Sequence, residues 1–249
     1  MIKKVLYWLY QPYKWLGLIP CFALWTFLCA TLSLILCTVA SPKTASKLAG
    51  ASWGRLSAYL TPILVRVVGR EHVDEKQSYV IVSNHQSIYD IFVLYGWLGV
   101  DFRWVMKQEV RKIPLLGAGC EKIGHIFIDR SNTAAALSSI NAAKGTIAGG
   151  TSIVFFPEGT RSKDGKLGRF KKGAFRFAVD LGLPILPVTI VGTRDIMPTN
   201  TVRIFPGRAT LIFHEPVSIA EYDEASIQDC INRVKETIAS SLEPRADLS

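Results

Sequence analysis

The stretch S-Y-V-I-V-S-N-H-Q-S-I-Y-D, Ser78–Asp90, carries the pattern on which the expected fold is based. Its first part, Ser78–Ser83, is rich in β-branched side chains and predicts a short buried strand. A helix is expected to begin near Ser87, so His85 lies in the turn and Asp90 in the first helical turn. The carboxylate can then accept a hydrogen bond from one imidazole nitrogen, and the other nitrogen can act as a base. Taken alone the pair is weak evidence, because an aspartate is favourable in the first turn of any helix.

The same alternation of strand and helix continues along the chain. Further strands are expected at Phe102–Met106, His125–Ile128, Thr151–Phe156 and Ile185–Val191, with Val202–Phe205 and Ala209–His214 paired in a hairpin. Helices are expected at Ser87–Leu98, Pro114–Ile123, from a Ser131 cap to Ile147, at Gly173–Leu181 and at Glu224–Leu242. This alternation predicts an α/β fold with a mainly parallel central sheet flanked by helices. Functional side chains in such folds gather at the carboxyl ends of the strands, where His85 is expected.

The N-terminal part of the chain has a different composition. The first 70 residues hold eight basic and no acidic side chains, whereas the remainder is almost neutral. Trp15–Ala40 contains no charged residue, and as a helix it would extend about 39 Å, more than the ~30 Å hydrocarbon core of a bilayer. Pro20 is expected to kink this helix, and Ser41-Pro42 to end it. A second helix, amphipathic and basic, is predicted over Ser46–Val68.

These features predict two parts: a membrane-associated helical segment, residues 1–70, and an α/β domain, residues 71–249. Basic charge concentrated in an apolar segment indicates an anionic bilayer surface rather than nucleic acid, for which charge would spread over the folded domain. Lysines flank the apolar helix at both ends, so the positive-inside rule gives no orientation. Both a single span and a monotopic pair of helices remain open, and we favour the monotopic arrangement because it keeps every charge at the interface.

The sequence motifs of several other kinds of functional site are absent from this sequence. The five cysteines form no C-x-x-C and no metal-ligand spacing, which indicates small buried or lipid-facing side chains in a reducing compartment and no metal site. There is no Walker A pattern and no G-x-S-x-G nucleophile turn. A histidine that activates an external hydroxyl is therefore favoured over a covalent enzyme intermediate. The other three histidines have no carboxylate at the same spacing and are expected to be structural or exposed; they are His72, His125 and His214.

A second pattern, F-P-E-G-T-R-S at Phe156–Ser162, also follows a predicted strand. Its backbone amides, the hydroxyl of Thr160 and the guanidinium of Arg161 are parts suited to binding a phosphate. Lys107 follows another strand, and Arg130 precedes a predicted helix N-terminus, so both could join such a site. The basic residues after this turn are interpreted as a solvated loop; they are Lys163, Lys166, Arg169, Lys171 and Lys172.

At these positions the sequence resembles the PlsC-like glycerolipid acyltransferases. N-H-Q-S-I-Y-D is similar to that family's N-H-x-S-x-x-D signature, and F-P-E-G-T-R-S to its second hallmark. G-H-I-F-I-D-R at Gly124–Arg130 and L-P-I-L-P-V-T-I at Leu183–Ile190 resemble two further blocks, and all four occur in the family's order. The resemblance covers about Ser83–Ile190 and is poorest after Gly192.

The resemblance implies transfer of a fatty acyl group from acyl-CoA or acyl carrier protein to the sn-2 hydroxyl of lysophosphatidic acid, giving phosphatidic acid. It implies that His85 deprotonates this hydroxyl and that Asp90 orients His85. The implied phosphate-binding residues are Glu158, Gly159, Thr160 and Arg161, helped by Arg130 and Lys107. No metal and no bound cofactor are implied, and the enzyme is expected at the inner (plasma) membrane with its α/β domain facing the cytoplasm. Another lysolipid acceptor, a thioester or phosphoester hydrolase, and a membrane scaffold with an inactive site remain as alternatives.

Overall fold

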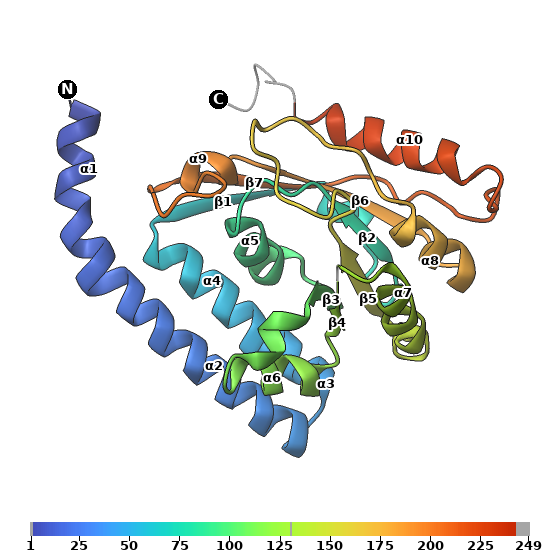
Figure 1. Ribbon diagram of the computed structural model, residues 1–249, viewed down its shortest axis with the longest axis horizontal. Helices are drawn as coiled ribbons and strands as arrows, with labels where there is room; N and C mark the ends of the chain where they lie inside the picture. Colours follow the sequence, from blue (N-terminus) through green and yellow to red (C-terminus); the bar gives the residue numbers. More distant parts are fainter. Residues whose placement is uncertain (1, 130, 243–249) are drawn as a thin grey trace.

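The computed structural model describes residues 2–129 and 131–242 (Figure 1). Within them lies a seven-stranded sheet of order β1-β7-β6-β2-β5-β3-β4. The strands are β1 (Ile63–Val68), β2 (Val80–Ser83), β3 (Asp101–Lys107), β4 (Ile126–Ile128), β5 (Thr151–Phe155), β6 (Ile185–Val191) and β7 (Gly207–Phe213). Neighbouring strands pair in parallel except for β6 and β7, which are antiparallel. The predicted mainly parallel α/β fold is confirmed.

Helices cover both faces of the sheet. They are α1 (Ile2–Pro12), α2 (Ile19–Val39), α3 (Pro42–Ala45), α4 (Ala51–Leu60), α5 (Tyr89–Trp97), α6 (Leu116–Ile123), α7 (Thr133–Ala142), α8 (Gly173–Leu181), α9 (Thr193–Ile196) and α10 (Ile227–Ala239). Val80 and Val82 of β2 belong to the core that contains α8 and α10, whereas Ile81 belongs to the core that contains α5. Burial on both faces explains why β2 is a continuous apolar run rather than an alternating one.

The N-terminal helix is continuous from α1 through α2 and runs along one side of the molecule (Figure 1). A π-helical stretch, Tyr13–Leu18, lies just before Pro20, which lacks the N–H for a regular helical hydrogen bond. The predicted end at Ser41-Pro42 is confirmed, since Ser41 caps α3 by accepting from the backbone N–H of Thr44. Among the described residues Tyr7–Val39 is long and apolar enough to cross a membrane by length and composition.

The second predicted helix, Ser46–Val68, is wrong after Leu60. Helix α4 ends there, and Ile63–Val68 forms β1, which pairs in parallel with β7. Alternating burial of β-branched side chains against a sheet explains the strand, but the partner lies far along the chain and local spacing does not reveal it. The sheet therefore takes its first strand from the segment 1–70 assigned to the membrane.

Two smaller predictions are also corrected. The hairpin expected between Val202–Phe205 and Ala209–His214 is absent, because Gly207–Phe213 forms the single strand β7 between β1 and β6. The cap of α7 is Asn132, whose side chain accepts from the N–H of Ala135, and not Ser131. This helix ends at Ala142 and is followed by a short 3₁₀ turn at Lys144–Thr146 rather than continuing to Ile147.

The exposed apolar face of α2 predicts that this helix contributes to membrane binding. Leu24 is 62% exposed and Leu28 is 52% exposed, so aspartates there leave the protein core intact. Each aspartate in a lipid-exposed helix costs about 2.5 kcal/mol or more, so the double variant should bind anionic vesicles at least about tenfold more weakly. Vesicle co-sedimentation of the full chain measures this, with aspartates at the exposed positions Gln77 and Asn232 as the control. Unchanged binding by the Leu24→Asp, Leu28→Asp variant would contradict a membrane role for this face.

Candidate active site

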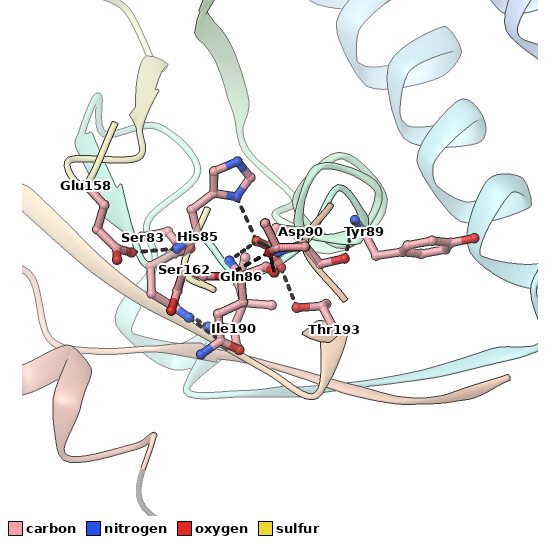
Figure 2. Close-up of polar contacts among 12 residues, drawn as sticks. Ser83, His85, Gln86, Tyr89, Asp90, Glu158, Ser162, Ile190 and Thr193 are labelled. Atoms are coloured by element: carbon pink, nitrogen blue, oxygen red, sulfur yellow. Dashed lines mark hydrogen bonds and ion pairs between the residues drawn. The ribbon is translucent and has the colours of Figure 1, made fainter. Parts of the chain in front are cut away.

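His85 and Asp90 meet at the carboxyl end of β2 (Figure 2). The imidazole Nδ1 lies 2.8 Å from Oδ2 of Asp90, as the strand-to-helix turn predicted. The Asp90 side chain is fully buried, whereas 14% of the His85 side chain is exposed. Figure 2 shows the second ring nitrogen of His85, Nε2, pointing away from the carboxylate. A carboxylate acceptor fixes the proton on Nδ1, so Nε2 is the atom able to accept another proton.

The buried carboxylate of Asp90 is held by donors from two separate segments. Its Oδ2 atom also accepts the backbone N–H groups of Gln86, at 2.7 Å, and Ser87, at 2.9 Å. Its Oδ1 atom accepts the hydroxyl of Thr193, the first residue of α9. A buried charge is tolerated only when it is hydrogen-bonded in this way. Asp90 is therefore fixed as the partner that orients the His85 ring.

The backbone of His85 is attached to the F-P-E-G-T-R-S turn on both sides. Its N–H donates to Oε1 of Glu158 at 2.9 Å, and its carbonyl accepts from the N–H of Ser162 at 2.8 Å. The second carboxylate oxygen of Glu158 accepts the N–H of Gly168 at 2.8 Å. Burial raises the pKa of Glu158, although the backbone N–H donors oppose this shift. Glu158 thus connects the two sequence patterns through backbone hydrogen bonds.

A stack of aromatic rings sets the plane of the His85 imidazole. The His85 ring lies 3.9 Å from the Phe156 ring at an interplanar angle of 11°. Phe156 in turn stacks with Trp104, at 5.5 Å and 26°. One face of the imidazole is therefore covered, and its rotation is limited by packing as well as by Asp90.

A cavity of about 800 Å³ opens beside His85. Its apolar walls come from α2, α4, α5, β3 and α6, and polar residues stand on the side of the phosphate-binding pattern. The cavity brings four of the predicted site residues together with His85: Lys107, Gly159, Thr160 and Arg161. Glu158 does not line it and lies behind the turn, while the predicted Arg130 lies outside the described residues.

Two residues that hold the site were not singled out from the sequence. Thr193 follows β6, the neighbour of β2, so the rule that carboxyl ends of adjacent strands meet could have found it. Asn84 belongs to the quoted stretch but was given no role there. Its amide donates to the carbonyl of Ile190 and accepts from the Ile190 N–H, both at 2.8 Å, which ties the turn to β6.

His125 is structural, as predicted, but it also supports the cavity wall. Its Nδ1 accepts the backbone N–H of Trp104 at 3.1 Å, and its Nε2 lies 2.5 Å from the hydroxyl of Tyr95, a residue of the cavity. Burial, with a smaller effect of Arg103, lowers the pKa of His125 to about 3. The ring is neutral at physiological pH and donates from Nε2 to Tyr95.

The geometry has a counterpart among known proteins. A family model described as Acyltransferase matches residues 64–191, which include both sequence patterns. The chain belongs to the acyltransferase family. It is 34% identical to 1-acyl-sn-glycerol-3-phosphate acyltransferase LPAT1, chloroplastic, of Arabidopsis thaliana, over 77% of this chain and 52% of that protein. It is also 34% identical to a Limnanthes douglasii 1-acyl-sn-glycerol-3-phosphate acyltransferase, over 76% of this chain and 67% of that protein.

A solved structure is similar over almost the whole length. The 1-acyl-sn-glycerophosphate (LPA) acyltransferase PlsC from Thermotoga maritima matches with a TM-score of 0.74 and 28% identity. The match covers 90% of this acyltransferase and 94% of the PlsC chain. By contrast, the chain spans about half the length of the first curated relatives, such as the Arabidopsis protein.

Replacing Thr193 by valine tests whether this residue positions the His85–Asp90 pair. The change leaves Oδ1 of Asp90 without its hydroxyl donor in a buried site. We expect kcat to fall about tenfold with an unchanged KM for the acceptor, because loss of one hydrogen bond to a buried charge costs about 1–3 kcal/mol. Steady-state kinetics measures this, and Thr193→Ser should restore kcat. Wild-type kcat in the valine variant, or an equal loss in the serine variant, would rule out this positioning role.

The buried His125 predicts a pH dependence of stability. Its pKa of about 3 in the folded state is below the value of about 6.5 expected when unfolded. Protons therefore bind the unfolded chain preferentially, and the free energy of unfolding should fall as pH drops from about 6.5, by at most ~1.4 kcal/mol per pH unit. Thermal unfolding in detergent should show a shallower decrease for His125→Gln than for wild type. A His72→Gln control should keep the wild-type slope, and equal slopes for all three proteins would contradict the assignment.

Proposed function

We propose that the chain transfers a fatty acyl group from a thioester to the sn-2 hydroxyl of lysophosphatidic acid, producing phosphatidic acid. The observation that carries the proposal is the single cavity that joins the base His85, the cations Lys107 and Arg161, and a deep apolar wall. A lysophospholipid has a hydroxyl, a phosphate and an acyl chain, one group for each of these three features. The names of the Arabidopsis, Limnanthes and Thermotoga relatives support the same acceptor.

The proposed reaction proceeds without a covalent enzyme intermediate. Nε2 of His85 accepts the proton of the sn-2 hydroxyl while its oxygen attacks the thioester carbonyl carbon. Asp90 stabilises the imidazolium that forms. The tetrahedral intermediate collapses by breaking the carbon–sulfur bond, and His85 returns the proton to the thiolate. The products are the ester and a free thiol, and we propose no metal and no bound cofactor.

The phosphate of the acceptor is proposed to bind at the turn after β5. Arg161, Thr160 and Lys107 contribute the guanidinium, the hydroxyl and the ammonium. Gly159 has a φ of +76°, a left-handed backbone conformation that glycine adopts without strain and other residues rarely adopt. We propose that Glu158 acts on phosphate binding by holding the turn, and the assignment of Arg130 stays a prediction.

The membrane supplies the acceptor in this proposal. The apolar, exposed face of α2 places lipid next to helices that also line the cavity. We propose an inner-membrane location with the α/β domain in the cytoplasm, and either acyl-CoA or acyl carrier protein as donor. For the helices of residues 1–70 we prefer the monotopic arrangement over a single span.

The proposal predicts the behaviour of His85→Ala. Loss of the general base should lower turnover about 10³-fold or more, while binding to anionic vesicles stays unchanged. The matched control His72→Ala should retain full activity. Conversion of lysophosphatidic acid to phosphatidic acid, followed by mass spectrometry, measures this. Wild-type turnover by His85→Ala would remove the histidine from this role.

A panel of acceptors and products separates the alternatives. We expect purified wild-type protein to acylate lysophosphatidic acid faster than lysophospholipids with larger head groups or lyso-aminolipids. If lysophosphatidic acid is among the poor acceptors, the proposed substrate is wrong. If free fatty acid dominates over esterified lipid when acceptor is present, the protein is a hydrolase instead.

A further inference from the structure

A second cavity, of about 660 Å³, lies on the other side of the F-P-E-G-T-R-S turn. Residues of the loop 158–172 line it, with Gln228 of α10 as the opposite wall. Six of its lining side chains are basic: Arg161, Lys163, Lys166, Arg169, Lys171 and Lys172. Thr160, Arg161 and Lys163 line this cavity and the active-site cavity alike. The two cavities are therefore neighbours that share one wall.

The loop that carries these cations is held in one conformation. Its two ends are joined by the bond from the N–H of Lys171 to the carbonyl of Pro157, at 2.9 Å. Glu158 binds the Gly168 N–H across the loop, and Phe170 is buried in the core below. The side-chain amide of Gln86 donates to the carbonyl of Gly165, which fastens the loop to the catalytic turn. A loop fixed at this many points presents its cations in a preorganised arrangement.

Positive charge exceeds negative charge in this cavity, where six basic side chains and two carboxylates, Glu158 and Asp164, line the wall. In the part of the chain that the structure describes, no ion pair is formed by Lys166, Arg169, Lys171 or Lys172. The carboxylate of Glu158 is occupied by backbone N–H groups, and that of Asp164 accepts from the Lys166 N–H and the Ser162 hydroxyl. An excess of cations around a hollow attracts a ligand with several negative charges.

The second cavity has more positive charge than the single phosphate of the proposed acceptor requires. Lysophosphatidic acid has one phosphate, for which Arg161 and Lys107 stand at the active-site cavity. Acyl carrier protein presents one phosphodiester on its prosthetic arm and a broad protein surface, which a concave cavity does not match. Coenzyme A has a diphosphate and a separate 3′-phosphate on a compact nucleotide, and its thioester is reached through the pantetheine arm. A small, multiply charged group suits a cavity with five basic side chains besides Arg161.

We propose that the cavity formed by the loop 158–172 binds the phosphate groups of a nucleotide-bearing acyl thioester, acyl-CoA. The shared wall places the pantetheine arm across the turn, so that the thioester enters the active-site cavity beside His85. The assignment rests on the proposed acyltransferase function and specifies its donor. Screening weakens charge-assisted binding, so the KM for acyl-CoA rises with ionic strength.

The first experiment is the double variant Lys166→Gln, Arg169→Gln. Both side chains are exposed, so the fold is retained. The KM for acyl-CoA should rise about tenfold or more, because the variant loses two charge-assisted hydrogen bonds to phosphate. The KM for lysophosphatidic acid should stay unchanged, as should the rate with an acyl-pantetheine thioester that lacks the nucleotide. The control variant Lys76→Gln, Arg208→Gln removes the same charge from exposed positions outside the cavity and should match wild type.

The second experiment measures binding without turnover. Titration calorimetry of the full chain in detergent compares free coenzyme A with pantetheine. Wild-type protein should bind coenzyme A more tightly than pantetheine, by about tenfold or more, and the double variant should lose this preference. These results support the site even if no lysolipid is acylated, in which case only the proposed reaction fails.

Three results would overturn the donor site. One is a rise in the KM for lysophosphatidic acid in the double variant with no change for acyl-CoA, which would make the cavity the acceptor site. Another is equal affinity of the wild-type protein for coenzyme A and pantetheine. The third is activity with acyl carrier protein alone, lost in the double variant, which would make the loop a protein-docking surface.

Discussion

The fully buried carboxylate of Asp90 is the constraint on which the rest of the site depends. A charged side chain that is shielded from water is stable only when hydrogen-bond donors surround it. The Asp90 carboxylate accepts hydrogen bonds from His85, Gln86, Ser87 and Thr193. Three of the donors belong to the turn between β2 and α5, and the fourth follows β6. The pairing of β2 with β6, reinforced by the two bonds of Asn84 to Ile190, thus fixes where the imidazole stands.

The second constraint connects the base to the anion-binding turn. Glu158 and Ser162 bind the two backbone polar groups of His85, and β5 lies directly beside β2 in the sheet. Neither contact uses the imidazole, so the ring remains available for proton transfer. A movement of either turn would shift the cations and the base together. The proposed base and the proposed phosphate-binding turn therefore form one hydrogen-bonded unit at the carboxyl ends of three adjacent strands.

The sequence predicted the parts of this unit that arise from local pattern. The continuous apolar run before Asn84 and the helix that follows were enough to bring His85 to Asp90, and Gly173–Leu181 and Ile185–Val191 were predicted with the observed bounds. The predictions that were wrong or missing concern residues whose structure depends on partners far along the chain. Ile63–Val68 is apolar at positions that also suit a helix, and only pairing with β7 makes it a strand. Thr193 follows a glycine with no chemical signature, and its role exists because β6 lies next to β2.

The central claim is that His85 accepts the proton of the acceptor hydroxyl. It is tested most directly by an experimental structure of the wild-type chain in a lipid bilayer mimic with lysophosphatidic acid and no acyl donor. The account predicts the sn-2 oxygen at hydrogen-bonding distance from Nε2 of His85, about 2.6–3.2 Å, with the phosphate against Arg161. A bound lysophosphatidic acid whose hydroxyl lies out of reach of Nε2, with its phosphate in the second cavity, would contradict it.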